Sequence, residues 1–235
     1  MKPWETIDRA LAPDGTELVL ARRGAEWVVR AGGHVLVSSR AHGSEEGLAA
    51  LGLERAARRD TVLVGGLGLG YTVRAVLDRV PAGARVIVAE LSRALVDWNR
   101  GPVSALAGRP LDDPRVRLQV SDVADRIAEA TRAFDAILLD VDNGPSALVH
   151  GRNERLYGEA GVHLAFEALK PGGALAVWSA GPDDRYLAAL RRAGFAAEAV
   201  PAPARAGSAG ARHVVFLGVK SPRPAPRRRT SAGRP

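Results

Sequence analysis

The residues of this sequence best suited to do chemistry follow short apolar runs. The run 62–64 leads directly into a glycine-rich turn that contains Gly65, Gly66, Gly68 and Gly70. Glycines let the backbone pass close to a ligand, and the helix expected after them supplies free backbone N–H groups. Glu90 ends the next apolar run, where a carboxylate can accept hydrogen bonds from both hydroxyls of a ribose. The pattern predicts a nucleoside site.

The same spacing occurs in dinucleotide-binding folds, so the two kinds of ligand must be separated. The dinucleotide fingerprint has Gly or Ala three residues after the second glycine of its G-x-G pair. In the frame that starts at Gly66 this place is Tyr71, which is too large for close packing of the helix on the strand. The pattern here is G-x-G-x-G instead. It favours an adenosyl sulfonium compound, S-adenosylmethionine or its decarboxylated form, over a nicotinamide dinucleotide.

Three further acids follow the next two apolar runs. Asp122 could accept a hydrogen bond from the exocyclic amine of adenine, and it could also cap the helix that follows it. Asp140 closes the run 134–140 and Asp142 follows two residues later, at the edge where open parallel sheets bind ligands. A carboxylate there can orient and deprotonate an amine nucleophile. The alternative is a loop held by Asx turns around Asn143.

The elements that must position these residues alternate between strand and helix patterns. Strands are expected at 61–65, 85–90, 116–121, 134–140 and 174–178. Helices are expected near 70–80, 92–100, 123–131, 153–169 and 183–193. This alternation predicts βαβ units and a parallel sheet covered on both faces. Residues 195–200 and 213–219 have no helix between them, so we expect an antiparallel hairpin on the sheet edge.

The first 58 residues have a different pattern. Short strand patterns at 16–21, 26–30 and 34–38, separated by turn signals, predict a small antiparallel sheet, and residues 44–59 predict a connecting helix. The predicted fold class is α/β, a Rossmann-like fold with a mostly parallel seven-stranded sheet and a small N-terminal β domain. We expect that domain with its helix at 1–58, a nucleoside-binding domain at 59–219 and a disordered basic tail at 220–235.

Composition excludes several classes of protein. The chain has 235 residues, of which 46% are hydrophobic and 25% are charged, as in globular domains. It has no Cys, and its five His include no pair at metal-ligand helical spacing, so no disulfide, cysteine nucleophile or metal site is expected. No apolar run approaches the roughly 20 residues that cross a bilayer. With no signal-peptide core at its start, the chain is expected in the cytoplasm without membrane insertion.

The net charge of +7 is concentrated at the C-terminus. Residues 220–235 hold six Lys and Arg and no acid, so the preceding residues carry a net charge of only +1. The same segment holds four Pro and almost no large apolar side chain, which predicts disorder. We interpret it as a solubilising terminus, or as a weak and salt-sensitive contact with nucleic acid or an acidic surface.

Taken in order, these motifs resemble the spermidine synthase family, within the class I S-adenosylmethionine-dependent methyltransferase fold. The resemblance rests on the glycine turn and its acids, on residues 112–116 before the third strand, on Gly144-Pro145 and on residues 153–157. It implies that Glu90 binds ribose, that Asp122 binds adenine and that Asp140 accepts the proton of an amine. It further implies a substrate contact for Tyr157 and a homodimer that associates through the N-terminal β domain. The position of Asp142 beside Asp140 at the strand end predicts a catalytic part for Asp142 as well.

Three departures from the family's pattern concern the substrate. The family's glycine turn carries an Asp that holds the amine of decarboxylated S-adenosylmethionine, and Gly68 occupies that place here. The family's second active-loop Asp comes three residues after the first, whereas Asp142 comes after two. The tyrosine and the His-Glu pair expected after the N-terminal sheet are replaced by the residues at 40–46.

The sequence therefore predicts a spermidine-synthase-like transferase with an adenosyl sulfonium donor and a small-molecule amine or other acceptor. Gly68 favours methyl transfer from S-adenosylmethionine, because the carboxylate of that donor would no longer be repelled. The alternative is aminopropyl transfer from decarboxylated S-adenosylmethionine to putrescine or a similar amine, as in polyamine biosynthesis. A further alternative is a non-catalytic nucleoside-binding module tethered through the basic tail.

Overall fold

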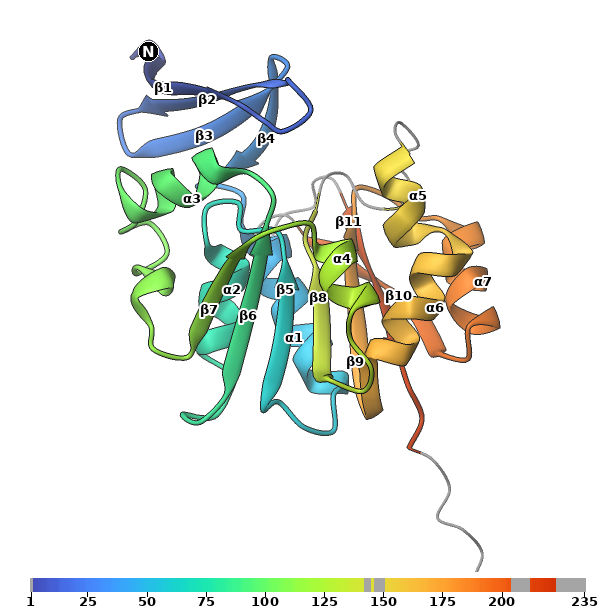
Figure 1. The fold of residues 1–235 in the computed structure, drawn as a ribbon. Helices are drawn as coiled ribbons and strands as arrows, with labels where there is room; N and C mark the ends of the chain where they lie inside the picture. The colour runs from blue at the N-terminus through green and yellow to red at the C-terminus, as the bar shows by residue number, and fades with distance from the viewer. Residues whose placement is uncertain (1, 142–144, 146–150, 204–211, 223–235) are drawn as a thin grey trace, which may run out of the picture.

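The chain folds as a small antiparallel sheet beside a larger, mostly parallel one, as the computed structural model shows (Figure 1). The structure describes residues 2–141, 145, 151–203 and 212–222. The small sheet is a four-stranded meander in the order β1-β2-β3-β4. Its strands are β1 (Glu5–Leu11), β2 (Glu17–Arg23), β3 (Glu26–Ala31) and β4 (His34–Ser38).

The large sheet has seven strands in the order β10-β11-β9-β8-β5-β6-β7. They are β5 (Thr61–Gly65), β6 (Arg85–Glu90), β7 (Val116–Val120), β8 (Phe134–Leu139), β9 (Leu169–Ser179), β10 (Ala196–Pro203) and β11 (Arg212–Val219). The five strands from β9 to β7 are parallel, and β11 pairs antiparallel with both β9 and β10. The fold class is thus the predicted one, with its terminal antiparallel hairpin.

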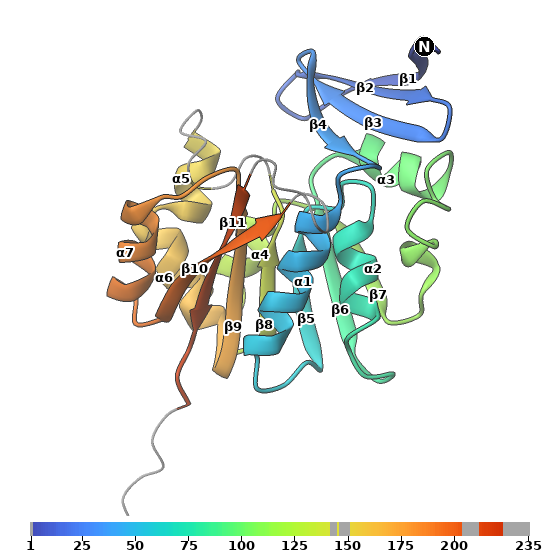
Figure 2. The same cartoon turned by 180° about the vertical axis from the view of Figure 1, so that it is seen from behind.

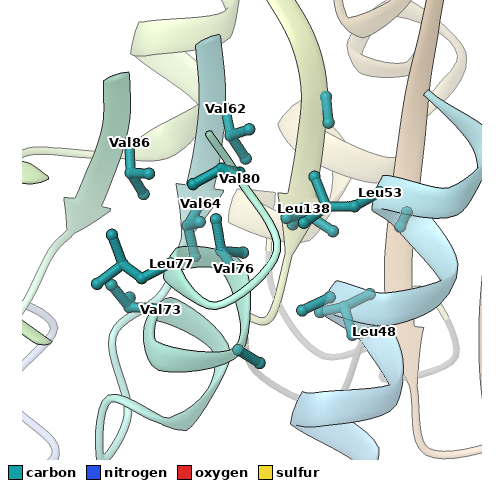
Figure 3. Packing of buried hydrophobic residues seen from close by; sticks show 14 of the residues in the cluster. Leu48, Leu53, Val62, Val64, Val73, Val76, Leu77, Val80, Val86 and Leu138 are labelled. Atoms are coloured by element: carbon teal, nitrogen blue, oxygen red, sulfur yellow. The ribbon is translucent and has the colours of Figure 1, made fainter. Parts of the chain in front are cut away.

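Helices cover both faces of this sheet, and each face has its own core. On one face α1 (Gly43–Arg55) and α2 (Tyr71–Leu77) lie side by side (Figure 2). On the other face lie α4 (Val123–Ala128), α6 (Glu159–Ala168) and α7 (Asp184–Arg192), with α5 (Gly151–Tyr157) before α6. Alternate residues of β5 point to opposite faces of the sheet. Val62 and Val64 belong to the core under α1 and α2 (Figure 3). Leu63 belongs to the core on the other face.

Helix α1 packs very closely on the sheet. A Cβ on Gly52 would lie 2.5 Å from Cδ2 of Leu138 and 2.8 Å from Cβ of Ala176, so only glycine allows this approach. Leu48 and Leu53 of the same helix face are fully buried in the core beside it (Figure 3). The start of α1 is therefore held firmly at the end of the sheet where β8 terminates.

The small sheet packs against the large one through a third cluster. Leu18, Leu20 and Val29 of the small sheet contact Leu69 of the glycine turn and Trp98 of α3 (Arg93–Arg100). The indole N–H of Trp98 donates a hydrogen bond of 2.7 Å to Asp8 Oδ2 on β1. Between α3 and β7 runs a short 3-10 helix, η1 (Pro110–Asp112).

Three details differ from the sequence prediction. Strand β1 was not expected, because its residues are mostly exposed and show no apolar run. The single helix expected at 153–169 is two helices, α5 and α6, which break at Gly158. Strand β9 begins at Leu169, five residues before the expected start.

The basic C-terminal segment is described only at its start. Lys220 is 8% exposed, and its Nζ donates to the carbonyl oxygen of Phe166 at 2.6 Å. The disordered tail was predicted at 220–235, and residues 223–235 of it lie outside the described residues. No helix in the part of the chain that the structure describes is long and apolar enough to span a membrane.

Candidate functional site

The glycine-rich turn joins β5 to α2 where the parallel strands end. Gly66 has a φ of +89°, and a Cβ on it would lie 2.2 Å from the carbonyl oxygen of Asp140. Glycine is required there, both for the left-handed backbone and for the close approach. The Asp140 N–H donates a hydrogen bond of 2.8 Å to the Gly65 carbonyl. The turn and the end of β8 are therefore locked together.

Glu90 lies at the end of β6, beside this turn. Its Oε2 accepts the Leu67 N–H at 2.8 Å and its Oε1 accepts the Ser92 N–H at 2.7 Å, and the residue is only 6% exposed. The carboxylate thus links the glycine turn to the start of α3.

Asn99 of α3 holds the same turn from the other side, a role that the sequence did not suggest. Its Nδ2 donates to the carbonyl oxygens of Gly68, at 2.9 Å, and of Leu95, at 2.8 Å. A Cβ on Gly70, whose φ is +87°, would lie 3.1 Å from Asn99 Oδ1. The turn is fixed by a buried side chain as well as by its own backbone.

Asp140 follows the last residue of β8. The hydroxyl of Thr72, at the start of α2, donates to its Oδ2 at 2.5 Å. Burial raises the pKa of Asp140, and the Thr72 hydrogen bond opposes that change. The carboxyl is thus oriented by a neutral donor and disfavoured as an anion, which suits a group that takes up a proton.

Glu45, in the first turn of α1, is a second carboxylate, on which the charge of Asp140 acts. Burial raises the pKa of Glu45 to about 7, and the charge of Asp140 contributes to the same change. The Ser44 hydroxyl donates to Glu45 Oε2 at 2.7 Å. From the sequence Glu45 could be explained as an acid favoured at a helix N-terminus. Its proximity to Asp140 depends on how α1 packs against the sheet, which no local signal reveals.

The start of α1 is also tied to α2. The His42 ring stacks on the Tyr71 ring with centroids 4.1 Å apart and an interplanar angle of 11°. His42 Nδ1 lies 2.9 Å from Glu46 Oε1. Burial, and after it the charges of Glu45 and Glu46, raise the pKa of Tyr71. Glu45 therefore interacts electrostatically both with Tyr71 on α2 and with Asp140, directly after β8.

The remaining predicted residues lie around this centre. Asp122 caps α4 by accepting the Ala124 N–H at 2.8 Å, so its structural role is present and an adenine contact stays a prediction. The Tyr157 hydroxyl donates to the Val141 carbonyl at 3.2 Å, and the residue is 7% exposed. Asp142 lies outside the described residues.

The structure therefore brings most of the predicted residues to one edge of the sheet. The glycine turn, Glu90 and Asp140 meet there, and Glu45, Thr72 and Asn99 join them without having been predicted. Among the described residues, no group of three His, Cys, Asp or Glu could hold a metal ion.

No protein-family model matches the chain. Among curated proteins, it is similar to the polyamine aminopropyltransferase of Nitrosomonas europaea, with 32% identity over 141 residues, which is 57% of this chain and 41% of that protein. It is also similar to the polyamine aminopropyltransferase of Korarchaeum cryptofilum, with 25% identity over 122 residues, or 52% of this chain and 36% of that protein. The matched region thus spans about two-fifths of the length of these relatives.

Solved structures share the fold. A spermidine synthase in complex with the transition-state analogue AdoDATO superposes with a TM-score of 0.73 at 19% identity, over 93% of this chain and 73% of that one. The spermidine synthase of Thermotoga maritima gives a TM-score of 0.74 at 19% identity, over 93% and 74% of the two chains. The fold is the spermidine-synthase-like Rossmann fold, and the resemblance predicted from the motifs is confirmed.

Proposed function

Starting from this likeness to spermidine synthases, we propose that the chain transfers an aminopropyl group from decarboxylated S-adenosylmethionine to an amine. One observation carries the proposal: a half-buried carboxylate, Asp140, is fixed by Thr72 beside the glycine turn, and its pKa is raised by burial. The similarity to proteins named polyamine aminopropyltransferases supports the same reaction. It supports aminopropyl transfer better than the methyl transfer that Gly68 favours.

The residues at the turn fit the adenosyl part of such a donor. Gly66, Gly68 and Gly70 all have positive φ and present no side chain, and the nearest atom to a Cβ on Gly68 would be Val37 Cγ2 at 3.8 Å. Glu90, held at the end of β6 beside the turn, would bind the ribose hydroxyls through its carboxylate. Asp122, at the start of α4, would accept the adenine amine.

The chemistry needs one proton acceptor from the protein. When bound, the donor supplies a carbon next to a positive sulfur, and the nitrogen lone pair bonds to that carbon as the carbon–sulfur electron pair leaves with a neutral thioether. Asp140 accepts the proton that the nitrogen loses. Since Oδ2 already accepts the Thr72 hydroxyl, Oδ1 is the oxygen that would take it. A positioned general base of this kind contributes roughly 100-fold to 10,000-fold to the rate.

Methyl transfer remains a second candidate for one reason. The glycine turn has no acid at Gly68, so it supplies no charge there to exclude the carboxylate of ordinary S-adenosylmethionine. The two reactions leave different nucleoside products, which are methylthioadenosine after aminopropyl transfer and S-adenosylhomocysteine after methyl transfer. The nucleoside product therefore decides between them.

The test is to incubate the protein with each donor and putrescine and to identify both products by mass spectrometry. We expect methylthioadenosine and an amine longer by one aminopropyl group, with the rate falling roughly 100-fold or more in Asp140→Asn. Asp97→Asn, at an exposed position on α3, is the control and should keep the rate. S-adenosylhomocysteine with a methylated amine would establish the second candidate. Nucleoside binding with neither product would instead support the non-catalytic module.

A further inference from the structure

We infer that Glu45 is a specificity-determining residue, which together with Asp140 holds the positive tail of the donor and makes the site prefer a tail without a carboxylate. The inference rests on the proposed function and goes beyond it, because it assigns charge selection to the start of α1. The glycine turn cannot select by charge, since its loop residues Gly65 to Gly70 carry no ionisable side chain.

The geometry holds Glu45 in place from two sides. Helix α1 is fixed on the sheet by Gly52, and its first turn is fixed to α2 by the stack of His42 on Tyr71. Ser44 is 2% exposed, and its hydroxyl donates to one carboxylate oxygen of Glu45. Glu45 is therefore an oriented group in a rigid helix and does not behave as a free surface acid.

The same frame positions its partner. Thr72, the second residue of α2, donates to Asp140. The backbone of Gly66 lies so close to the Asp140 carbonyl that a side chain at position 66 would collide with it. Helix α2 thus donates to Asp140 through Thr72, and its Tyr71 lies within the electrostatic influence of Glu45. The two carboxylates come from elements far apart in the sequence and converge beside the turn proposed to hold the donor.

The electrostatics of the pair lack a counter-charge. Among the described residues, no Lys or Arg forms an ion pair with either carboxylate or stabilises its charge. Two adjacent, partly buried acids disfavour each other's ionisation, and a cation placed beside them reverses that effect. A donor tail ending in an ammonium group supplies such a cation, whereas a tail that also carries a carboxylate adds a third negative charge.

The experiment compares three ligands by calorimetry on the wild-type protein, Glu45→Gln and Glu54→Gln. Methylthioadenosine reports the adenosyl site alone, decarboxylated S-adenosylmethionine adds an ammonium tail, and S-adenosylmethionine adds a carboxylate to that tail. Glutamine matches the size of glutamate and can still accept the Ser44 bond. Glu54, exposed at the far end of α1, gives the matched control.

We expect Glu45→Gln to lower the affinity for the decarboxylated donor roughly 10-fold or more, as for loss of a hydrogen bond between charged groups. Methylthioadenosine should bind Glu45→Gln within about twofold of wild type, which also shows that the variant is folded. S-adenosylmethionine should bind it equally or more tightly, and Glu54→Gln should match the wild type throughout. Equal weakening of all three ligands, or no change for the decarboxylated donor, would overturn the role of Glu45. If the wild-type protein binds none of the three, the proposed function fails, and the inference fails with it.

Discussion

Two acidic regions meet at the same edge of the sheet and are built in opposite ways. Glu90 is stabilised as an anion by two backbone N–H groups and is nearly inaccessible to solvent. In the described part of the chain, the side-chain donors to Asp140 and Glu45 are the hydroxyls of Thr72 and Ser44, and burial raises the pKa of both acids. The hydrogen bonds of the first region favour a carboxylate as an anion, whereas burial in the second region favours the protonated form.

This difference suits the first region to ligand binding and the second to charge selection and proton transfer. A carboxylate that is held by backbone N–H groups suits a neutral ligand group with hydroxyl donors, such as a ribose. A pair that resists double ionisation suits a cation or a proton, because either one relieves the repulsion. Substitutions in the two regions should therefore give different patterns of ligand dependence, and substitution at their junction should disrupt both.

Gly66 is that junction, and Gly66→Ala is expected to have the largest effect. The new Cβ would lie 2.2 Å from the Asp140 carbonyl oxygen, and alanine is strained at a φ of +89°. We expect a loss of about 3 kcal/mol or more in the free energy of unfolding. Urea denaturation measures it. Gly83→Ala is the control, because its φ is not positive and a Cβ there would meet no atom within 4 Å; similar losses in both variants would show that Gly66 has no special role.

Glu90→Gln should have the next largest effect, and one that does not depend on the donor tail. The glutamine amide places N–H donors against one of the two backbone N–H groups, which leaves that group unsatisfied at a cost of about 1–3 kcal/mol. We expect calorimetry to show that the affinities for methylthioadenosine and for both sulfonium donors fall by the same factor. If only the affinity for the decarboxylated donor fell, Glu90 would belong with the charge-selective region, and the two regions would not differ in function.

The two regions also differ in how much of them the sequence reveals. The apolar runs of β5 and β6 place the glycine turn and Glu90 at strand ends, and both strands lie at the predicted residues. Asp140 follows from the same argument, since it comes directly after β8. Position relative to a buried parallel strand is a local property, and the alternating pattern is sufficient to predict it.

The residues that the sequence did not reveal act across long separations. Asp140 acts on Glu45 because Gly52 lets α1 pack closely on β8 and β9. From the sequence alone, a glycine inside a predicted helix indicates only a lower helix propensity. Strand β1 was missed because it is an edge strand whose inner residues, such as Ile7, are only partly buried. Tertiary packing decides such positions, and a single sequence carries little local signal for it.

The acid pair predicts a pH dependence of stability with a definite sign. The pKa of Glu45 is about 7 in the folded protein, above its ordinary value of 4.5, so the folded state binds the proton more tightly than the unfolded state. Stability is therefore greatest below about pH 4.5 for this group and declines as the pH rises toward 7. Because Glu45 is partly exposed, the decline should be no more than about 2 kcal/mol.

The charged groups that act on Glu45 are Asp140, directly after β8, and Glu46 on α1, and both favour its protonated form. The measurement is the free energy of unfolding between pH 5 and pH 8 for the wild-type protein and Glu45→Gln. The difference between the two curves should change across this range in the direction given above. Parallel curves would show that Glu45 does not titrate near neutrality, and the second region would then resemble the first.

Tyr157→Phe should have the smallest effect and tests where the second region ends. The hydroxyl donates to the Val141 carbonyl at 3.2 Å, directly after Asp140, and the ring packs edge-on against Tyr186 at 5.8 Å. If Tyr157 only supports that backbone, removing the hydroxyl costs about 0.5–1.5 kcal/mol of stability. Binding of decarboxylated S-adenosylmethionine should then stay within about twofold, because the carboxylates of Asp140 and Glu45 are retained.

A contact with the acceptor, as the family resemblance implies, would give a different result for the same variant. The KM for putrescine would rise while the free energy of unfolding stayed near the wild-type value, since the lost hydrogen bond would be one to the substrate. Tyr186→Phe is a poor control because that ring is buried, and burial raises the pKa of its hydroxyl. His163→Gln on α6 is the better control, because it lies on a neighbouring helix and its side chain has no hydrogen bond to other described residues. A change in KM without a change in stability would extend the reacting region from Asp140 to α5, and the opposite pattern would end it at Val141.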